Sequence, residues 1–372
     1  MDVKSAFLNG YIDEEIYADQ PIGYEILGIS ISQSKYVADL LKKFRVASCT
    51  SVATLVTRNE KLTKKYVGYY SHRCPHVESI INSTVSKAQH KDPLLARVII
   101  RMHFHDCFIR GCDGSILIDS TPGNKAEKDS PANFPSLRGF EVIDEAKRII
   151  ESVCPQVVSC ADIIAFAARD SSYEAGKISW YVPAGRKDGR ILKEAEIINN
   201  LPPSFFNFQQ LTDLFEQKGL YQEDVVFLSG NVFFHKCHSI GVSHFSSFHD
   251  RLYNFNNTGV ADPSLDPQLA KSLKVKCPRA MTSDPTVPLE SITPAKLDNV
   301  YYSELLRNRG LLTYDHTLIT NSDTRKMVQA NSRYPTLWRR KFANAMVKMG
   351  TIDVLTGSQG EIRKNYGIVN RN

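Results

Sequence analysis

The sequence predicts a mostly α-helical fold with minimal β structure. From Tyr69 onward, apolar residues recur at helical spacing in one segment after another. The strict alternation of apolar and polar residues that is typical of strands is scarce, and Pro, Gly or Asp residues flank the helical segments. No segment repeats, so a solenoid or other repeat architecture is excluded.

Each expected helix has a local signal. The first covers residues 76–90 directly after Pro75, because proline is favoured at the start of a helix. The next covers 93–105 and carries its apolar residues on one face. The other helices are expected at 139–153, 160–171, 208–218, 299–309 and 335–349.

Composition excludes several classes of protein. Apolar residues make up 42% and charged residues 23%, which is typical of a folded globular chain. A formal net charge of +6 is too small and too scattered for a nucleic-acid binder. The apolar run at 163–168 is about a third of the roughly 18–20 residues that a membrane span needs. We therefore expect no nucleic-acid and no membrane partner.

Two features point to different compartments. Seven of the eight cysteines lie after residue 70 and none forms a C-x-x-C pair, so the cysteines favour an oxidising compartment. The N-terminus, MDVKSAFLNGYIDEEIYADQP, has neither the basic start nor the apolar run of a secretory signal.

Residues 101–115, RMHFHDCFIRGCDGS, are the most informative stretch. Arg101 and His105 are four positions apart, so they share one face of a helix. A lone histidine on a helix is more often a core or surface residue without chemistry. Here, however, Asp106, Asp113 and Ser115 follow with carbonyls from a glycine-containing turn, and calcium prefers such hard oxygen ligands.

This stretch resembles the distal-haem motif of the class III plant secretory peroxidases, and the resemblance covers residues 66–372. It implies a two-lobed, all-helical fold with haem between a distal and a proximal half. The matching segments are YYSHRCP (69–75), VSCADIIAFAARDS (158–171), WYVPAGRKDGR (180–190), NLPPSFF (200–206), DRLYNF (250–255) and LTGSQGEIRKN (355–365).

The resemblance implies a role for each catalytic residue. His105 is expected to take a proton from peroxide and return it to the departing oxygen. Arg101 is expected to stabilise the charge that develops as the O–O bond breaks. Asn133 is expected to hydrogen-bond His105 and fix its tautomer.

The proximal half departs from the family pattern. His238, in HSIG, matches the axial ligand of the haem iron, Asp315 matches its carboxylate partner, and Pro202 matches the aromatic-donor site. However, seven residues, NVFFHKC, follow LSG (228–230) where the family has one. They include His235, so the axial ligand stays open between two histidines, and HSIG favours His238.

The implied cofactors are haem b and two calcium ions. Calcium 1 is expected to bind Asp106, Asp113, Ser115 and the carbonyls of Ile109 and Gly111, with Glu127 behind them. Calcium 2 is expected to bind Ser239, Glu290, Thr293, Asp298 and the carbonyl of Lys296. Glu290 stands where the family usually has Asp.

The family forms four disulfides, and two have both partners here: Cys74–Cys154 and Cys107–Cys112. The partner of Cys160 is replaced by Tyr366, the partner of Cys277 is replaced by Phe245, and Cys237 lies eight residues upstream of that position. Each missing disulfide removes about 2–5 kcal/mol of stability.

The predicted function is therefore a haem peroxidase that reduces hydrogen peroxide and oxidises phenolic or similar small donors by one-electron steps. A role in peroxide removal under oxidative stress, a monomeric state and an extracellular location in the cell wall or apoplast follow from the resemblance. The alternative is a catalytically impaired relic with a disrupted proximal haem site.

Residues 1–65 form a separate segment. Residues 1–25 resemble a copia-type retrotransposon reverse transcriptase around its first catalytic aspartate, here Asp2, and residues 27–44 resemble a later part of that polyprotein. The paired-aspartate motif that should lie between them is missing, and two-metal polymerase chemistry needs those carboxylates. We expect a non-functional fragment and linker at 1–65, followed by the peroxidase domain at 66–372.

Deleting residues 1–65 should leave haem content and turnover unchanged, because this segment supplies no expected ligand. Haem absorbance per mole of protein and initial rates with peroxide check this. Loss of folding in the truncated chain would show that the segment belongs to the domain.

Overall fold

The computed structural model describes residues 67–191, 193–203, 206–229 and 239–370. The chain divides into two units, Met1–Glu60 and Lys61–Asn372, and the description below concerns the second. Across these ranges, every helix is too short or too polar to span a bilayer.

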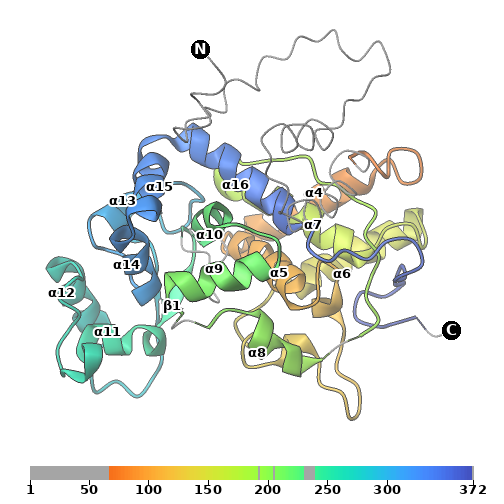
Figure 1. The fold of residues 1–372 in the computed structure, drawn as a ribbon. Coiled ribbons are helices and arrows are strands. Elements are labelled where there is room, and N and C mark those ends of the chain that lie inside the picture. Colours follow the sequence, from red (N-terminus) through yellow and green to blue (C-terminus); the bar gives the residue numbers. More distant parts are fainter. Residues whose placement is uncertain (1–66, 192, 204–205, 230–238, 371–372) are drawn as a thin grey trace, which may run out of the picture. The chain divides into compact units, whose positions relative to one another are not determined.

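Helices dominate the described part of the chain, which confirms the predicted mostly α fold (Figure 1). The first helices are α4 (Val77–Lys91), α5 (Leu95–Ile109), α6 (Phe140–Val153), α7 (Cys160–Gly176), α8 (Ile197–Asn200), α9 (Phe208–Gln217) and α10 (Gln222–Ser229). They are followed by α11 (His249–Tyr253), α12 (Pro267–Lys276), α13 (Val300–Leu306), α14 (Thr313–Thr320), α15 (Ser322–Arg333) and α16 (Pro335–Met349).

The β structure of the described residues is small, as predicted. Strands β1 (Val242–His244) and β2 (Thr286–Pro288) pair antiparallel, with Ser243 opposite Val287. Short 3₁₀ turns and isolated bridges complete the connections.

The helices form two groups (Figure 1). In one group, α7 packs against α4, α5 and α6. In the other, α15 packs against α13, α14 and α16. Helix α10 contacts α9, α15 and α16, and Phe108 of α5 lies 4.8 Å, ring centre to ring centre, from Phe215 of α9. The two groups therefore share one hydrophobic core.

Helix α5 is the central helix of the first group. All of its residues except Arg97 are buried. It extends to Ile109, four residues beyond the predicted end at residue 105. As a result, His105 and Asp106 lie inside a regular helix, where the backbone holds their relative positions.

A buried ion pair ties distant parts of the domain together. Arg186 Nη1 donates to Asp162 Oδ1 of α7 at 2.7 Å, and both side chains are almost fully buried. Arg186 Nη2 also donates to the Gly350 carbonyl, directly after α16, at 2.6 Å. The hydroxyl of Tyr70 donates to the other oxygen of Asp162 at 2.6 Å.

Arg186→Leu should lower the free energy of unfolding by about 3–5 kcal/mol, because it leaves the buried Asp162 carboxylate without its cation. Arg148→Leu is the control, since Arg148 and its partner Glu145 are both exposed, and solvent screens such a pair so that its loss should change stability far less. Urea unfolding of both variants measures the difference. Equal losses would contradict this account.

His103 on α5 gives the fold a sensitivity to acid. Its side chain is 3% exposed, and burial, together with the positive charge of Arg186, lowers its pKa to about 3. The unfolded chain takes up this proton near pH 6.5, whereas the folded chain resists doing so until about pH 3.

The free energy of unfolding should therefore fall as pH decreases from about 6.5 toward 3, by about 3–5 kcal/mol from this group. His103→Leu should flatten this part of the profile, whereas replacing the exposed His76 should not. Urea midpoints between pH 7 and 4 measure the effect. An unchanged slope in His103→Leu would assign the acid sensitivity to other groups.

Candidate active site

Arg101, His105 and Asn133 form a buried hydrogen-bonded chain. The two α5 residues lie one helical turn apart, and Arg101 Nε donates to His105 Nε2 at 3.1 Å. On the other side of the ring, His105 Nδ1 lies 2.6 Å from Asn133 Oδ1. The structure therefore brings together the three residues that the sequence analysis selected.

The orientation of Asn133 determines the tautomer of His105. Asn133 Nδ2 donates to the carbonyl of Glu127 at 2.7 Å, so its Oδ1 faces the imidazole. An amide oxygen accepts only, so the ring proton lies on His105 Nδ1. His105 Nε2 is then left as a basic acceptor beside the guanidinium of Arg101.

The loop that follows Asn133 holds Arg101 in place. Arg101 Nη2 donates to the carbonyl of Ala132 and to Ser136 Oγ, each at 3.1 Å. Ser136 Oγ in turn donates to the Asn133 carbonyl. The sequence analysis missed Ser136, because a single serine in a polar loop carries no spacing signal.

On the proximal side, Asp315 of α14 is buried and accepts hydrogen bonds from two of the described residues. Its Oδ1 accepts from the hydroxyl of Tyr301 at 2.7 Å, and its Oδ2 accepts from the backbone N–H of Leu312 at 2.8 Å. Burial and the nearby Asp315 raise the pKa of Tyr301 well above its usual value. Tyr301 was not predicted. His238, the expected axial ligand, lies outside the described residues, as does the insert at 231–237.

Pro202 lies directly after α8, which packs against α5, and its side chain is buried. Residues 204 and 205, which follow Pro203, lie outside the described ranges. The expected donor-site residue therefore follows, after Leu201, a short helix that packs against the helix carrying His105.

A cluster of buried acids lies at the end of α5. Asp106 Oδ2 accepts from the N–H of Gly114 and Asp113 Oδ1 accepts from the N–H of Ser115, both at 3.0 Å. Ser115 Oγ lies 3.4 Å from Glu127 Oε2. Burial and the neighbouring Asp113 raise the pKa of Asp106 well above its usual value, and the same two causes raise the pKa of Glu127 to about 8.

These residues fit a hard cation. Glu127 Oε1 is buried and has no hydrogen-bond partner within the described structure, and buried carboxylates favour a positive partner. Gly111, with φ of +105°, lets the chain turn directly after α5, and a disulfide closes this turn. In the described ranges, no three His, Cys, Asp or Glu side chains have a metal-binding arrangement. The expected ligand set does not need one, because it includes a hydroxyl and backbone carbonyls.

The second expected set of oxygen ligands also comes together. Ser239 Oγ donates to the carbonyls of Asp298 and Lys296, at 2.9 and 3.2 Å. Thr293 Oγ1 donates to Glu290 Oε2 at 2.9 Å and lies 3.2 Å from Asp298 Oδ1. Glu290, Asp298 and Ser239 are buried. The longer side chain of Glu290 reaches the N–H groups of Ile292 and Thr293.

The disulfides Cys74–Cys154 and Cys107–Cys112 are formed, which confirms the expected pairing. Cys160 and Cys277 are free and buried, as the loss of their partner positions implies. Cys237 lies outside the described residues.

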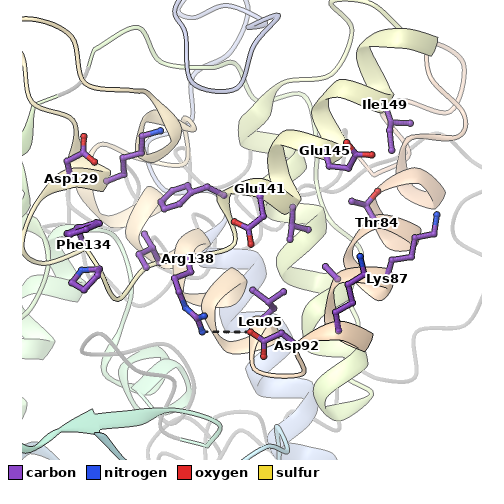
Figure 2. Close-up of a pocket in the computed structure, with 17 residues that line it drawn as sticks. Thr84, Lys87, Asp92, Leu95, Asp129, Phe134, Arg138, Glu141, Glu145 and Ile149 are labelled. Carbon is purple, nitrogen blue, oxygen red and sulfur yellow. Dashed lines mark ion pairs between the residues drawn. The ribbon is translucent and has the colours of Figure 1, made fainter. Parts of the chain in front are cut away.

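A surface pocket of about 910 Å³ lies between α4, α6 and the loop after Asn133 (Figure 2). Phe134, Leu95 and Ile149 contribute apolar surface, and Arg138 pairs with Asp92 at 3.9 Å across it. Neither Arg101 nor His105 lines this pocket. It is therefore separate from the catalytic chain.

The comparisons with known proteins agree with this geometry. The family model described as "Peroxidase" matches residues 81–333. "Peroxidase 5" of Vitis vinifera is 54% identical over 305 residues, covering 82% of this chain and 91% of the relative. "Peroxidase 30" of Arabidopsis thaliana is 46% identical, covering 81% of this chain and 90% of the relative. "Peroxidase 1" of Zea mays is 42% identical, covering 91% of this chain and 92% of the relative.

The matched residues contain the buried Arg101–His105–Asn133 chain, both acid clusters and Asp315, all on a mostly α fold. The family match and the identity to several plant peroxidases together establish the relationship. The chain belongs to the peroxidase family and is a peroxidase enzyme of the plant type.

Proposed function

We propose that the chain is an active haem peroxidase that reduces hydrogen peroxide and oxidises small phenolic donors one electron at a time. The observation that carries this proposal is the buried chain from Arg101 through His105 to Asn133. Burying the polar side chains of Arg101 and His105 in a helix is costly, so these side chains favour a ligand site on this face of α5. Haem b, when bound, supplies the iron that exchanges electrons with peroxide and donor.

The side chains of the protein then accept and return the proton that the reaction moves. His105 Nε2 is unprotonated, because Asn133 holds the ring proton on Nδ1, so it accepts a proton from hydrogen peroxide. It returns this proton to the departing oxygen, which leaves as water. The guanidinium of Arg101, held by Ala132 and Ser136, stabilises the negative charge that develops on the oxygens.

On the proximal side, His238 would hold the haem iron, and Asp315 would accept a hydrogen bond from its imidazole. Tyr301 and Leu312 fix the orientation of this carboxylate, and a fixed carboxylate makes the imidazole more electron-donating. Pro202 is assigned to the entrance for small aromatic donors.

We also assign one calcium ion to each oxygen cluster. Calcium 1 takes Asp106, Asp113, Ser115 and the carbonyls of Ile109 and Gly111, with Glu127 behind them. Calcium 2 takes Ser239, Glu290, Thr293, Asp298 and the carbonyl of Lys296. The raised carboxylate pKa values at the first cluster support a cation there, because a bound cation neutralises the buried charge.

The remaining proposals concern the whole chain. The peroxidase domain at 66–372 acts as a monomer on peroxide and small donors in the cell wall or apoplast, without nucleic-acid or membrane partners, and contributes to peroxide removal under oxidative stress. Residues 1–65 are a retrotransposon-derived fragment without activity. The secreted plant peroxidases that this chain resembles support the location.

His105→Ala should slow the reaction with hydrogen peroxide by about 10²–10⁴-fold while haem stays bound, because His105 moves a proton and does not hold the iron. Stopped-flow absorbance gives the rate, and the haem Soret band gives the occupancy. His90→Ala, at an exposed position, is the control. A variant as fast as the parent would rule out His105 as the base.

Removing calcium with EDTA should destabilise the folded chain by about 2.7 kcal/mol for each of the two sites, relative to calcium at a hundredfold above its Kd. Urea unfolding with EDTA, with calcium and with magnesium measures this, and calcium should restore what magnesium does not. Identical unfolding curves in all three buffers would refute both calcium assignments.

A further inference from the structure

A row of aromatic side chains leads inward from the surface, starting at Trp180 in the segment after α7. The Trp180 ring lies 6.1 Å from Phe342 of α16, centre to centre and edge to face. Phe342 stacks on Trp338, one turn earlier on the same helix, at 6.0 Å. Trp180 is half-buried, whereas Phe342 and Trp338 are fully buried. The outer half of the row thus connects solvent with the core.

The inner half of the row continues to the proximal carboxylate. Trp338 lies 6.4 Å from Tyr302 of α13, and Tyr302 lies 5.2 Å from its neighbour Tyr301. The hydroxyl of Tyr301 donates to Asp315 Oδ1 at 2.7 Å. Each step is within the 4.5–7 Å range of packed aromatic pairs. We call the residues from Trp180 to Tyr301 the aromatic row.

The row begins at a surface cleft of about 550 Å³. Trp180 and Tyr181 line this cleft, and Tyr181 is 81% exposed. Lys177, Arg339 and Arg340 also line it, and its lining contains no acidic residue. The cleft therefore offers oxidisable aromatic rings beside three cationic side chains.

Tryptophan and tyrosine are among the side chains most easily oxidised to radicals, and electron transfer between them falls off steeply with distance. Four such residues, Trp180, Trp338, Tyr302 and Tyr301, follow one another here, and Phe342 bridges the first two. The hydrogen bond to Asp315 gives the Tyr301 proton a place to go when the ring is oxidised.

We propose that the Trp180–Tyr181 cleft is a second donor site, and that the aromatic row carries electrons from it to the proximal side of the active site. This inference rests on the proposed peroxidase function, which supplies the oxidant. Two phenol groups each lose one electron and one proton. The two electrons and two protons reduce one hydrogen peroxide to two water molecules. The Tyr301 proton moves to Asp315 and returns when Tyr301 is reduced.

The chemistry of the cleft favours an anionic phenolic polymer. A cleft of this volume accommodates one aromatic ring while the rest of a polymer stays outside. Lys177, Arg339 and Arg340 attract carboxylates near that ring. Such a donor is too large to reach the buried Arg101 and His105, and the aromatic row lets it react from the surface.

The test compares free guaiacol with guaiacol groups attached to carboxymethyl dextran, using the haem-loaded full chain. Trp180→Phe and Trp338→Phe should each lower kcat/KM for the polymer about tenfold and change that for free guaiacol less than about twofold. Tyr221→Phe, at an exposed position outside the row, is the matched control. Guaiacol on neutral dextran should react more slowly than on the anionic carrier.

A second measurement detects the radicals directly. After one equivalent of peroxide without donor, a nitroso spin trap should label Trp180 or Tyr181, as located by peptide mass spectrometry. The label should disappear in Trp338→Phe and persist in Tyr221→Phe. The proposal is overturned if neither Trp180 nor Tyr181 is labelled in the parent. It is also overturned if Trp180→Phe and Trp338→Phe lower kcat/KM equally for free guaiacol and for the polymer. A parent chain that does not oxidise free guaiacol would instead overturn the proposed function.

Discussion

The hydrogen bond between His105 and Asn133 is the interaction on which the distal site depends. It sets the ring proton on Nδ1 and leaves Nε2 as the base. Asn133 is itself oriented by the carbonyl of Glu127, whose carboxylate reaches Ser115 in the buried acid cluster. The proposed calcium site and the proposed base are therefore connected through one residue. A change in the acid cluster reaches His105, the proposed base, through two hydrogen bonds.

Helix α5 fixes the positions of Arg101, His105 and Asp106 relative to one another. Arg101, His105 and Asp106 lie within six residues of a buried helix, so the backbone sets their spacing. The loop from Ala132 to Ser136 then fixes the guanidinium and the imidazole from outside the helix. Polar groups on a buried helix must be fully hydrogen-bonded, and here the same bonds that meet this need also aim the side chains.

The sequence predicted the helices of the first group well, because their apolar periodicity is strong, and Pro75 and Pro93 precede the first two of them. It also placed Arg101 and His105 on one face, since that follows from their spacing alone. It did not reveal Ser136 or Tyr301, because contacts between a loop and a helix, or between two helices, leave no periodic signal. The end of α5 was placed four residues early, since the polar residues His105 and Asp106 look like a helix end, whereas both are buried inside the helix.

Departures from the family pattern were visible in the sequence, but their consequences were not. The resemblance implied that Cys160 lacks a partner, whereas only the fold shows where that thiol lies. Tyr366, at the vacated partner position, is half-buried against the core, and the ammonium group of Lys128 lies 5.3 Å from its ring centre. The packed ring of Tyr366 therefore occupies the position at which the resemblance implies a cysteine in a disulfide with Cys160.

The burial of Cys160 has a chemical consequence for an enzyme that handles an oxidant. Peroxide attacks thiolates rather than thiols, and oxidation proceeds from sulfenic acid to irreversible states. Burial raises the pKa of Cys160 to about 12, and the nearby Asp188 acts in the same direction. The sulfur thus stays protonated and out of contact with solvent. The chain therefore lacks a disulfide at Cys160, and the thiol that remains there is protected from oxidation by peroxide.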